Sequence, residues 1–157
     1  MAIRRLVRRQ GDSFRLKLTR AEQQYLASMI EDLRDLLVAE SPASDASVAR
    51  LFPPAYPDDL LQNLDFERTA GSGLLGSRLE SLDKAAVSID APRLNEEDLL
   101  TLMRVVNDLR LVLGTRLGVT EESEASSFQD EGDRSQFALY QFLGWFISDI
   151  VDALAAD

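Results

Sequence analysis

Basic side chains crowd the start of this chain, and they are its residues best suited to chemistry. Seven of the first twenty residues are basic and only Asp12 is acidic. A guanidinium group donates hydrogen bonds in a fixed fork that matches a phosphate or a carboxylate, so this cluster predicts contact with an anionic partner. The candidate contact residues, for a partner protein or for nucleic acid, are Arg4, Arg5, Arg8, Arg9, Arg15 and Lys17.

A second polar set lies inside the apolar segment NDLRLVLGTRLGV. Its candidate residues, which form a polar patch for a partner or an anionic ligand, are Asn107, Asp108, Arg110 and Arg116. An arginine buried on such a helix needs an acid beside it, so pairing within the chain is the favoured interpretation of this patch. Gly114 predicts a close approach of two helices, because glycine costs about 1 kcal/mol relative to alanine within a helix.

The chain lacks the residue types that most catalytic, redox and transition-metal sites require. Cysteine and histidine are both absent, which removes disulfides, thiolate catalysis and the commonest general base and transition-metal ligand. Carboxylates are numerous, but the D-x-D-x-D-G spacing of a calcium-binding loop is missing. We therefore expect no enzyme activity, no catalytic or metal-binding residues and no cofactor.

The net charge of −10 hides an asymmetry: the first twenty residues carry +6, and the rest of the chain carries −16. Because residues 21–157 are strongly acidic, they repel a phosphate backbone. A protein partner is therefore favoured over nucleic acid. The apolar stretches are interrupted by charges, and the first twenty residues lack the apolar core of a secretory signal. We expect a cytoplasmic protein without membrane contact.

The patterning predicts a mainly α fold in a single domain over residues 1–157, with about five helices and an N-terminal two-stranded β-hairpin. The segment SFRLKLT alternates apolar and basic residues, and QGDS before it is turn chemistry, so residues 3–18 form the predicted hairpin. The predicted helices are 20–40, 58–70, 74–88, 96–117 and 135–155.

Local signals set several of these boundaries. Thr19 and Glu22 form a capping box at the first helix, and Asn95 is placed to cap the central helix at 96–117. Gly71 and Gly73 predict a break between the second and third helices. Residues 120–134 carry six acids and one arginine without periodicity, which predicts a mobile acidic loop.

The last helix carries two apolar stripes, and a bundle buries about one stripe of a terminal helix. We therefore expect a homodimer through the second stripe. The residues of this candidate dimer face are Phe142, Trp145, Phe146 and Ile150. The alternative is that the hairpin or residues 51–66 cover the second stripe within the same chain.

The order of these features resembles an actinobacterial family, the domain of unknown function "twenty-seventeen". The resemblance covers nearly the whole chain, and its most specific pieces are NDLRLVLGTRL at residues 107–117 preceded by LFPPAY at residues 51–56. It implies a small, mainly helical protein with no assigned catalytic site, commonly encoded near a Clp protease adaptor. Some members are described as transcriptional regulators, in places with a redox theme that relies on cysteine, which this chain lacks.

Together these features predict a non-enzymatic regulatory module that acts by protein–protein contact, with transcription control as one setting. Two alternatives stay open. One is a regulator that binds DNA directly through the basic hairpin. The other is an adaptor linked to Clp-type proteolysis.

Overall fold

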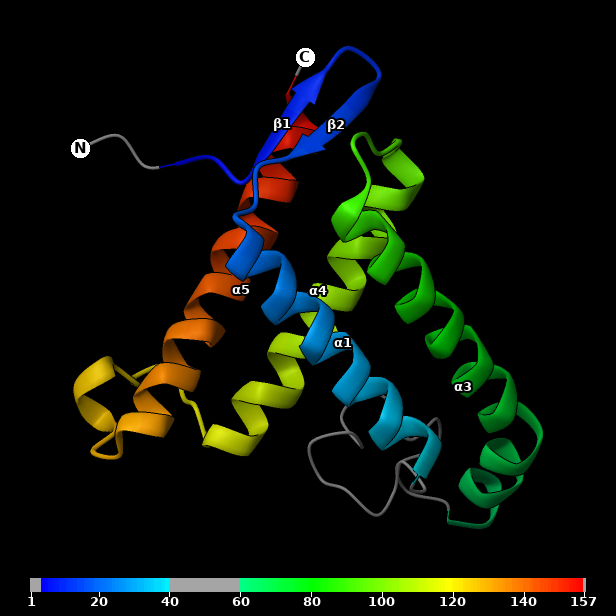
Figure 1. The fold of residues 1–157 in the computed structure, drawn as a ribbon. Coiled ribbons are helices and arrows are strands. Elements are labelled where there is room, and N and C mark those ends of the chain that lie inside the picture. The colour runs from blue at the N-terminus through cyan, green and yellow to red at the C-terminus, as the bar shows by residue number, and fades with distance from the viewer. Residues whose placement is uncertain (1–3, 40–59, 157) are drawn as a thin grey trace.

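The computed structural model describes residues 4–39 and 60–156 (Figure 1). The described helices are α1 (Arg20–Ala39), α3 (Leu60–Asp90), α4 (Glu96–Leu117) and α5 (Glu131–Ala155), with a short 3-10 turn at Ala125–Ser127. The strands are β1 (Val7–Gln10) and β2 (Ser13–Leu16). The expectation of a mainly α fold with an N-terminal antiparallel hairpin is confirmed, although the described residues contain four helices where about five were predicted. The motif at residues 51–56 lies outside the described residues.

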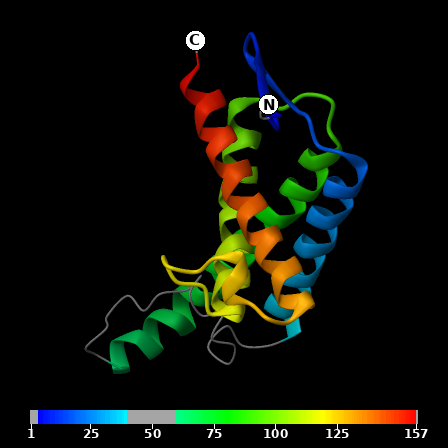
Figure 2. The ribbon, with the colours of Figure 1, turned by 90° about the vertical axis from the view of Figure 1, so that its left-hand side faces the viewer.

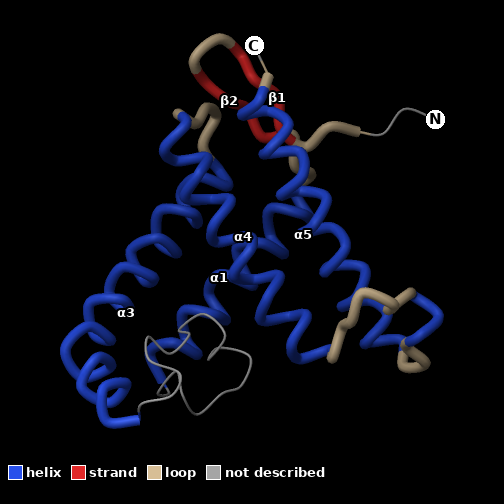
Figure 3. The backbone as a smooth tube through the Cα atoms, turned by 180° about the vertical axis from the view of Figure 1, so that it is seen from behind, coloured by secondary structure: helices blue, strands red, loops and turns tan. Residues whose placement is uncertain are grey.

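Helix α4 lies at the centre of the bundle, as its apolar girth predicts. It packs against α5, α3 and α1, and its N-terminal end lies beside β2. Its buried apolar side chains face these neighbours in turn; they are Leu99, Leu102, Val105, Val106, Leu109 and Val112. Away from the hairpin end, α3 and α5 lean apart on either side of α4 (Figures 1 and 3).

The predicted helix caps are present at α1 and α4. The side chain of Glu22 accepts from the Thr19 N–H at 2.8 Å, and the Thr19 hydroxyl accepts from the Glu22 N–H at 3.1 Å. The Asn95 side chain accepts from the Asp98 N–H at 2.8 Å. At the other end of α4, Gly118 has a left-handed backbone with φ of 68°, a conformation that glycine adopts at little cost.

The predicted break between residues 70 and 74 is wrong, because α3 is one helix of 31 residues. Gly71 and Gly73 keep their backbone N–H groups, so they weaken a helix without interrupting its hydrogen bonds. Packing of α3 against α1 and α4 supplies the missing stability. The first turns of α3 extend past the ends of the other helices (Figure 2).

Helix α5 begins at Glu131, four residues before its predicted start. Asp130 caps it by accepting from the Gly132 and Asp133 N–H groups. Carboxylates are favourable at this end of a helix, where the backbone dipole is positive. The acidic segment after α4 is therefore shorter than the predicted loop of residues 120–134, and part of its charge belongs to the helix.

Helix α5 is also long and apolar enough, by length and composition, to cross a membrane. The charges within this helix are therefore too few to exclude it by length and composition. The finding is weak support for a membrane span, because the core helix of a soluble protein passes the same test. In this bundle α5 buries Phe137, Leu143, Phe146, Ile150 and Ala153 against its own chain.

The hairpin caps one end of the bundle, beside the C-terminal end of α5 (Figure 1). Its turn contains Gly11, whose φ is 63°. The strand register places Val7 opposite Leu16, Arg8 opposite Arg15 and Arg9 opposite Phe14. Val7 and Phe14 are buried, so one face of the hairpin packs on the helices and the other faces solvent.

Candidate functional site

Arg4 of the candidate contact set is used inside the fold. Its guanidinium group donates to both carboxylate oxygens of Glu22 on α1, at 2.7 and 2.6 Å, and to the Lys17 carbonyl oxygen at 2.7 Å. It also lies 5.9 Å from the ring centre of Trp145 on α5. Burial alone would raise the pKa of Glu22, but the hydrogen bonds from Arg4 and Thr19 and the Arg4 charge outweigh it, so that pKa is lowered. Arg4 therefore joins the start of the hairpin to two helices.

Arg5 and Arg9 attach the hairpin to the C-terminal end of α5. Arg5 forms an exposed ion pair with Asp152 at 3.1 Å. Arg9 stacks on Phe14 at 5.5 Å and donates to the backbone carbonyl of Ala156, the residue that ends α5. A cation at a helix C-terminus meets the negative end of the backbone dipole, so both contacts hold the hairpin in place.

A buried contact with α5, which the sequence pattern did not predict, also anchors the hairpin. The Leu6 N–H donates to the Asp149 carboxylate at 2.7 Å, and both residues are buried. Asp149 stands among the buried apolar residues of α5. A charged residue inside an apolar helical stripe was the available signal, but its partner is a backbone group that no side-chain pattern reveals.

The remaining candidates on the hairpin are Arg8, Arg15 and Lys17. Arg8 and Arg15 are exposed and lie directly opposite each other across the two strands. Within the described residues neither side chain has a hydrogen bond, an ion pair or a ring contact. Lys17 is half-buried, and its backbone N–H donates to the Leu6 carbonyl at 2.7 Å. The free positive charge of the hairpin is thus centred on Arg8 and Arg15.

The predicted polar patch on α4 is not one patch. Asp108 is buried against α3 and pairs with Arg78. Burial raises the pKa of Asp108, and the charge and hydrogen bond of Arg78 offset this only in part. Asn107 and Arg116 are exposed. Successive residues of a helix are about 100° apart around its axis. Asn107 and Asp108, although adjacent in sequence, therefore face solvent and α3 respectively.

Arg110 lies on yet another side of α4, against α5. Its guanidinium group stacks 4.6 Å from the ring centre of Tyr140, and its buried Nε atom has no hydrogen-bond partner among the residues that the structure describes. The predicted close approach at Gly114 involves the same ring, since a Cβ at that position would lie 2.8 Å from Cε2 of Tyr140. Gly144, one turn after Tyr140, also lies beside Arg110, but a Cβ there would meet the Arg110 Nε at 3.5 Å, which is an ordinary van der Waals contact. This part of the motif is a helix–helix contact.

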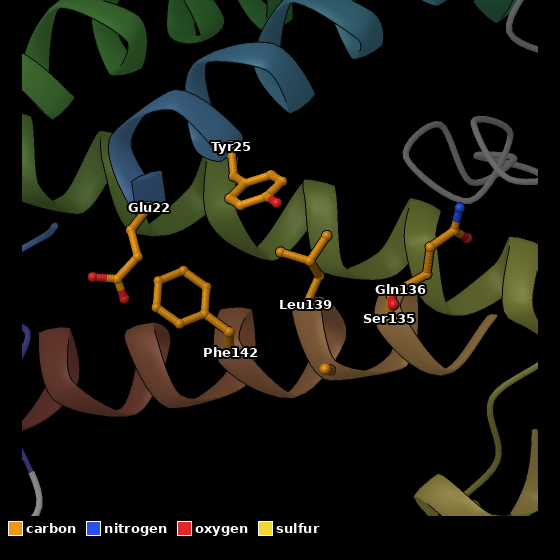
Figure 4. Close-up of a pocket in the computed structure, with 7 residues that line it drawn as sticks. Glu22, Tyr25, Ser135, Gln136, Leu139 and Phe142 are labelled. Atoms are coloured by element: carbon orange, nitrogen blue, oxygen red, sulfur yellow. The ribbon is translucent and has the colours of Figure 1, made fainter. Parts of the chain in front are cut away.

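An open groove of about 340 Å³ separates α1 from α5, with α4 behind it (Figure 4). Tyr25 on α1 and Leu139 and Phe142 on α5 point into this gap (Figure 4). Glu22 lines one end, where Arg4 already holds its carboxylate. The groove is therefore an apolar recess with room for one or two side chains of a partner. The titratable residues of its lining are Glu22 and Tyr25.

The four residues of the predicted dimer face do not form an exposed surface in the single chain. Phe146 and Ile150 have no exposed area within the single chain, and Phe142 and Trp145 are half-buried. Strand β1 packs against α5. This agrees with the alternative stated above, in which the hairpin covers the second apolar stripe of the last helix within the same chain. A second copy of the chain could reach Phe146 only by displacing this packing.

Comparison with known proteins identifies the family of this chain. The family model described as "Domain of unknown function (DUF2017)" matches residues 4–154. This chain belongs to that family. The match spans the hairpin and every described helix almost to the end of α5. No curated protein and no solved structure matches the chain.

Proposed function

We propose that this member of the DUF2017 family is a non-enzymatic, cytoplasmic regulatory module that acts by binding another protein. The observation that carries the proposal is the exposed pair Arg8 and Arg15. These two side chains face each other on the solvent side of the hairpin without a carboxylate partner in the described residues. Like charges directly opposite each other destabilise a hairpin, so an anionic partner would relieve that repulsion.

The anchoring of the hairpin supports this proposal. Arg4, Arg9 and the buried contact between Leu6 and Asp149 attach it to α1 and α5. A surface held in place before binding loses little conformational entropy when the partner arrives, which favours affinity. The groove beside Tyr25 and Phe142 offers a second, apolar contact at the same end of α1.

Affinity capture followed by reconstitution tests the proposal. The full chain is used as bait in lysate of its native host, the captured protein is purified, and its binding is measured directly. We expect a stoichiometric complex that is weakened when Arg8 and Arg15 are both changed to Ser. The matched control changes Arg20 and Arg104, two exposed arginines away from that pair, to Ser. The absence of any partner that survives reconstitution would refute the proposal.

Direct DNA binding is the second candidate, because the same two arginines could contact phosphates. It predicts an affinity for duplex DNA that falls steeply with salt, in proportion to the number of phosphates contacted. A stoichiometric complex with the captured protein, together with no saturable binding of duplex DNA at low salt, would exclude it as the main activity.

The family resemblance suggests two settings, transcription control and Clp-type proteolysis. The identity of the captured protein separates them. A component or regulator of transcription supports the first, and a protease subunit or its substrate supports the second.

A further inference from the structure

A third chain segment extends the hairpin and brings another arginine to its exposed face. The backbones of Phe14 and Leu94 exchange two hydrogen bonds, of 2.8 and 2.9 Å, in an antiparallel bridge. In antiparallel pairing the residue after one partner lies opposite the residue before the other. Arg93, which precedes Leu94, is therefore placed beside Arg15.

Arg8, Arg15 and Arg93 thus form a row across three neighbouring segments of chain. Arg8 is paired with Arg15 by the strand register, and opposite residues in a sheet project to the same face. Neighbouring strands are about 4.8 Å apart, so the row spans about 10 Å between its outer Cα atoms. All three side chains are exposed, and none has a hydrogen bond or ion pair to a described residue.

This arrangement lowers stability unless an anion occupies it. Arg15 has a like charge on each side, and such opposite pairs are unfavourable. The contrast with Arg4, Arg5 and Arg9 is informative, because each of those has a carboxylate or carbonyl partner within the chain. Within the described residues, three arginines without a partner therefore lie together on the outer face of the hairpin and its extension, whereas the other two, Arg20 and Arg104, belong to α1 and α4.

We infer that the row of Arg8, Arg15 and Arg93 binds the carboxylates of an acidic segment in a partner protein. The inference rests on the proposed function and adds to it the class of partner and the residue Arg93. Each guanidinium group offers a planar fork that fits one carboxylate. A segment with two or three closely spaced Asp or Glu residues matches a row of this length.

The surroundings favour an acidic protein segment over nucleic acid. Proteins that hold duplex DNA commonly neutralise about 6–10 phosphates, and the row supplies three arginines. Helix α4 begins just after Arg93, and its first turn carries Glu96, Glu97 and Asp98. A long phosphate backbone that follows the row would run toward these acids, whereas a short acidic segment ends before it reaches them.

The test uses the full chain and a short peptide of alternating Asp and Glu as the probe. Side-chain Nε–Hε signals of arginine are followed by NMR during titration, and the dissociation constant is fitted from them. We expect saturable shifts at Arg8, Arg15 and Arg93. Arg15→Ser, at the centre of the row, should weaken binding by about tenfold, in line with the loss of one charge-assisted interaction.

Arg104→Ser is the matched control, because it removes the same charge from an exposed site on α4 outside the row. Its effect should stay within about twofold, as for a distant surface charge. The midpoint of thermal unfolding of Arg15→Ser should equal or exceed that of the wild type. This readout separates a binding role from a structural one, which would lower the midpoint.

Three outcomes would overturn the inference. They are no saturable binding of the peptide, an equal loss for Arg15→Ser and Arg104→Ser, and tighter binding of a short DNA duplex with the same sensitivity to Arg15→Ser. The proposed function is judged separately. If the reconstituted partner binds Arg15→Ser and the wild type equally well, the row is wrong while protein binding stands. If the peptide binds as expected and no partner protein is found, the row stands and the proposed function fails.

Discussion

At the scale of single residues, the contact between α4 and α5 depends on the Tyr140 ring, which lies over Gly114 and beneath the Arg110 guanidinium group. Arg110 and Gly114 are one helical turn apart on α4, and Tyr140 and Gly144 are one turn apart on α5. The Tyr140 ring fills the space over Gly114, while the Arg110 guanidinium covers the ring and passes Gly144. A glycine inside a helix loses about 1 kcal/mol relative to alanine, and this close approach explains Gly114, whereas a Cβ at Gly144 would make only an ordinary contact.

We predict that Gly114→Ala destabilises the protein. The added Cβ would lie 2.8 Å from Tyr140 Cε2, closer than carbon atoms can approach, so the ring or the helix must move. Overpacking of this kind costs about 1–3 kcal/mol, which outweighs the gain in helix propensity. The control is Gly76→Ala in α3, where a Cβ meets nothing within 4 Å and should stabilise by about 0.5–1 kcal/mol. Urea unfolding measures both, and equal gains for the two variants would contradict the prediction.

We predict how the stabilisation by the ion pair between Glu22 and Arg4 changes with pH. Its pKa is lowered in the fold from an ordinary value of 4.5, so the unfolded chain binds the proton more tightly than the folded one. The stabilisation from its ion pair with Arg4 is therefore present above pH 4.5 and is lost as the pH falls through the lowered pKa. The difference in unfolding free energy between the wild type and Glu22→Gln should be constant above pH 4.5 and shrink below it. Urea unfolding at a series of pH values measures this difference, and growth on acidification would show that another interaction dominates.

At the scale of elements, the hairpin is stable because it is attached, since a two-stranded hairpin alone is marginal in water. Its buried anchor is the carboxylate of Asp149, which accepts from the Leu6 N–H at 2.7 Å. Its exposed anchor is the ion pair between Arg5 and Asp152. These two contacts come from the same helix and differ chiefly in burial.

We predict that Asp149→Ala lowers the free energy of unfolding by about 1–3 kcal/mol, because it leaves the buried Leu6 N–H without a partner. Asp152→Ala, which removes only the exposed ion pair, should change it by less than about 0.5 kcal/mol. Urea unfolding compares the two variants, and amide hydrogen exchange should show faster exchange across the hairpin for Asp149→Ala alone. Equal effects of the two substitutions would show that burial does not set the strength of this anchor.

The elements also show which parts of the fold could be predicted from sequence. Both ends of α4 are predicted correctly because Asn95 and Gly118 act through neighbouring backbone groups. The predicted break in α3 is wrong because packing against α1 and α4 outweighs the local cost of Gly71 and Gly73. The bridge between Phe14 and Leu94 joins segments eighty residues apart, so no local pattern could place Arg93 beside the hairpin.

The candidate site was predictable in part for the same reason. Composition shows that the N-terminal segment is basic, and the hairpin places Arg8 and Arg15 on its outer face. Composition does not show that Glu22 holds Arg4 or that the end of α5 holds Arg9, because those contacts join segments that are distant in sequence. The number of arginines available to a partner is therefore smaller than the sequence suggests.

At the scale of the whole molecule, the described charges are unevenly spread. The hairpin with its free arginines lies at one end of α5, and the acidic segment before α5 lies at the other (Figure 1). Because the net charge is −10, the basic hairpin end is where we expect a partner that carries acidic residues to be attracted. The charge distribution therefore orients an approaching acidic partner before contact is made.

The covered stripe of α5 leads to a prediction about assembly. Phe146 and Ile150 have no exposed area, and the large apolar side chains that are exposed within residues 4–38 and 75–156, namely Tyr25, Val38, Val87 and Val151, lie on three separate helices. Scattered single residues of this kind do not form the continuous apolar patch of a stable dimer. We therefore expect a single species of 17.5 kDa in sedimentation equilibrium at micromolar concentration.

Two substitutions on α5 test how that stripe is buried. Phe146→Glu removes a core ring and places a carboxylate where nothing can pair with it, which costs more than the about 3–5 kcal/mol of a Phe→Ala change. This is comparable with the whole stability of a small domain, so we expect a large loss of helical circular dichroism. Val151→Glu, at a residue of the same helix that is 49% exposed, should keep the fold. If the wild type sediments as a dimer and Phe146→Glu yields a folded monomer, Phe146 belongs to an interface between chains, and the packing of β1 on α5 is not what covers it.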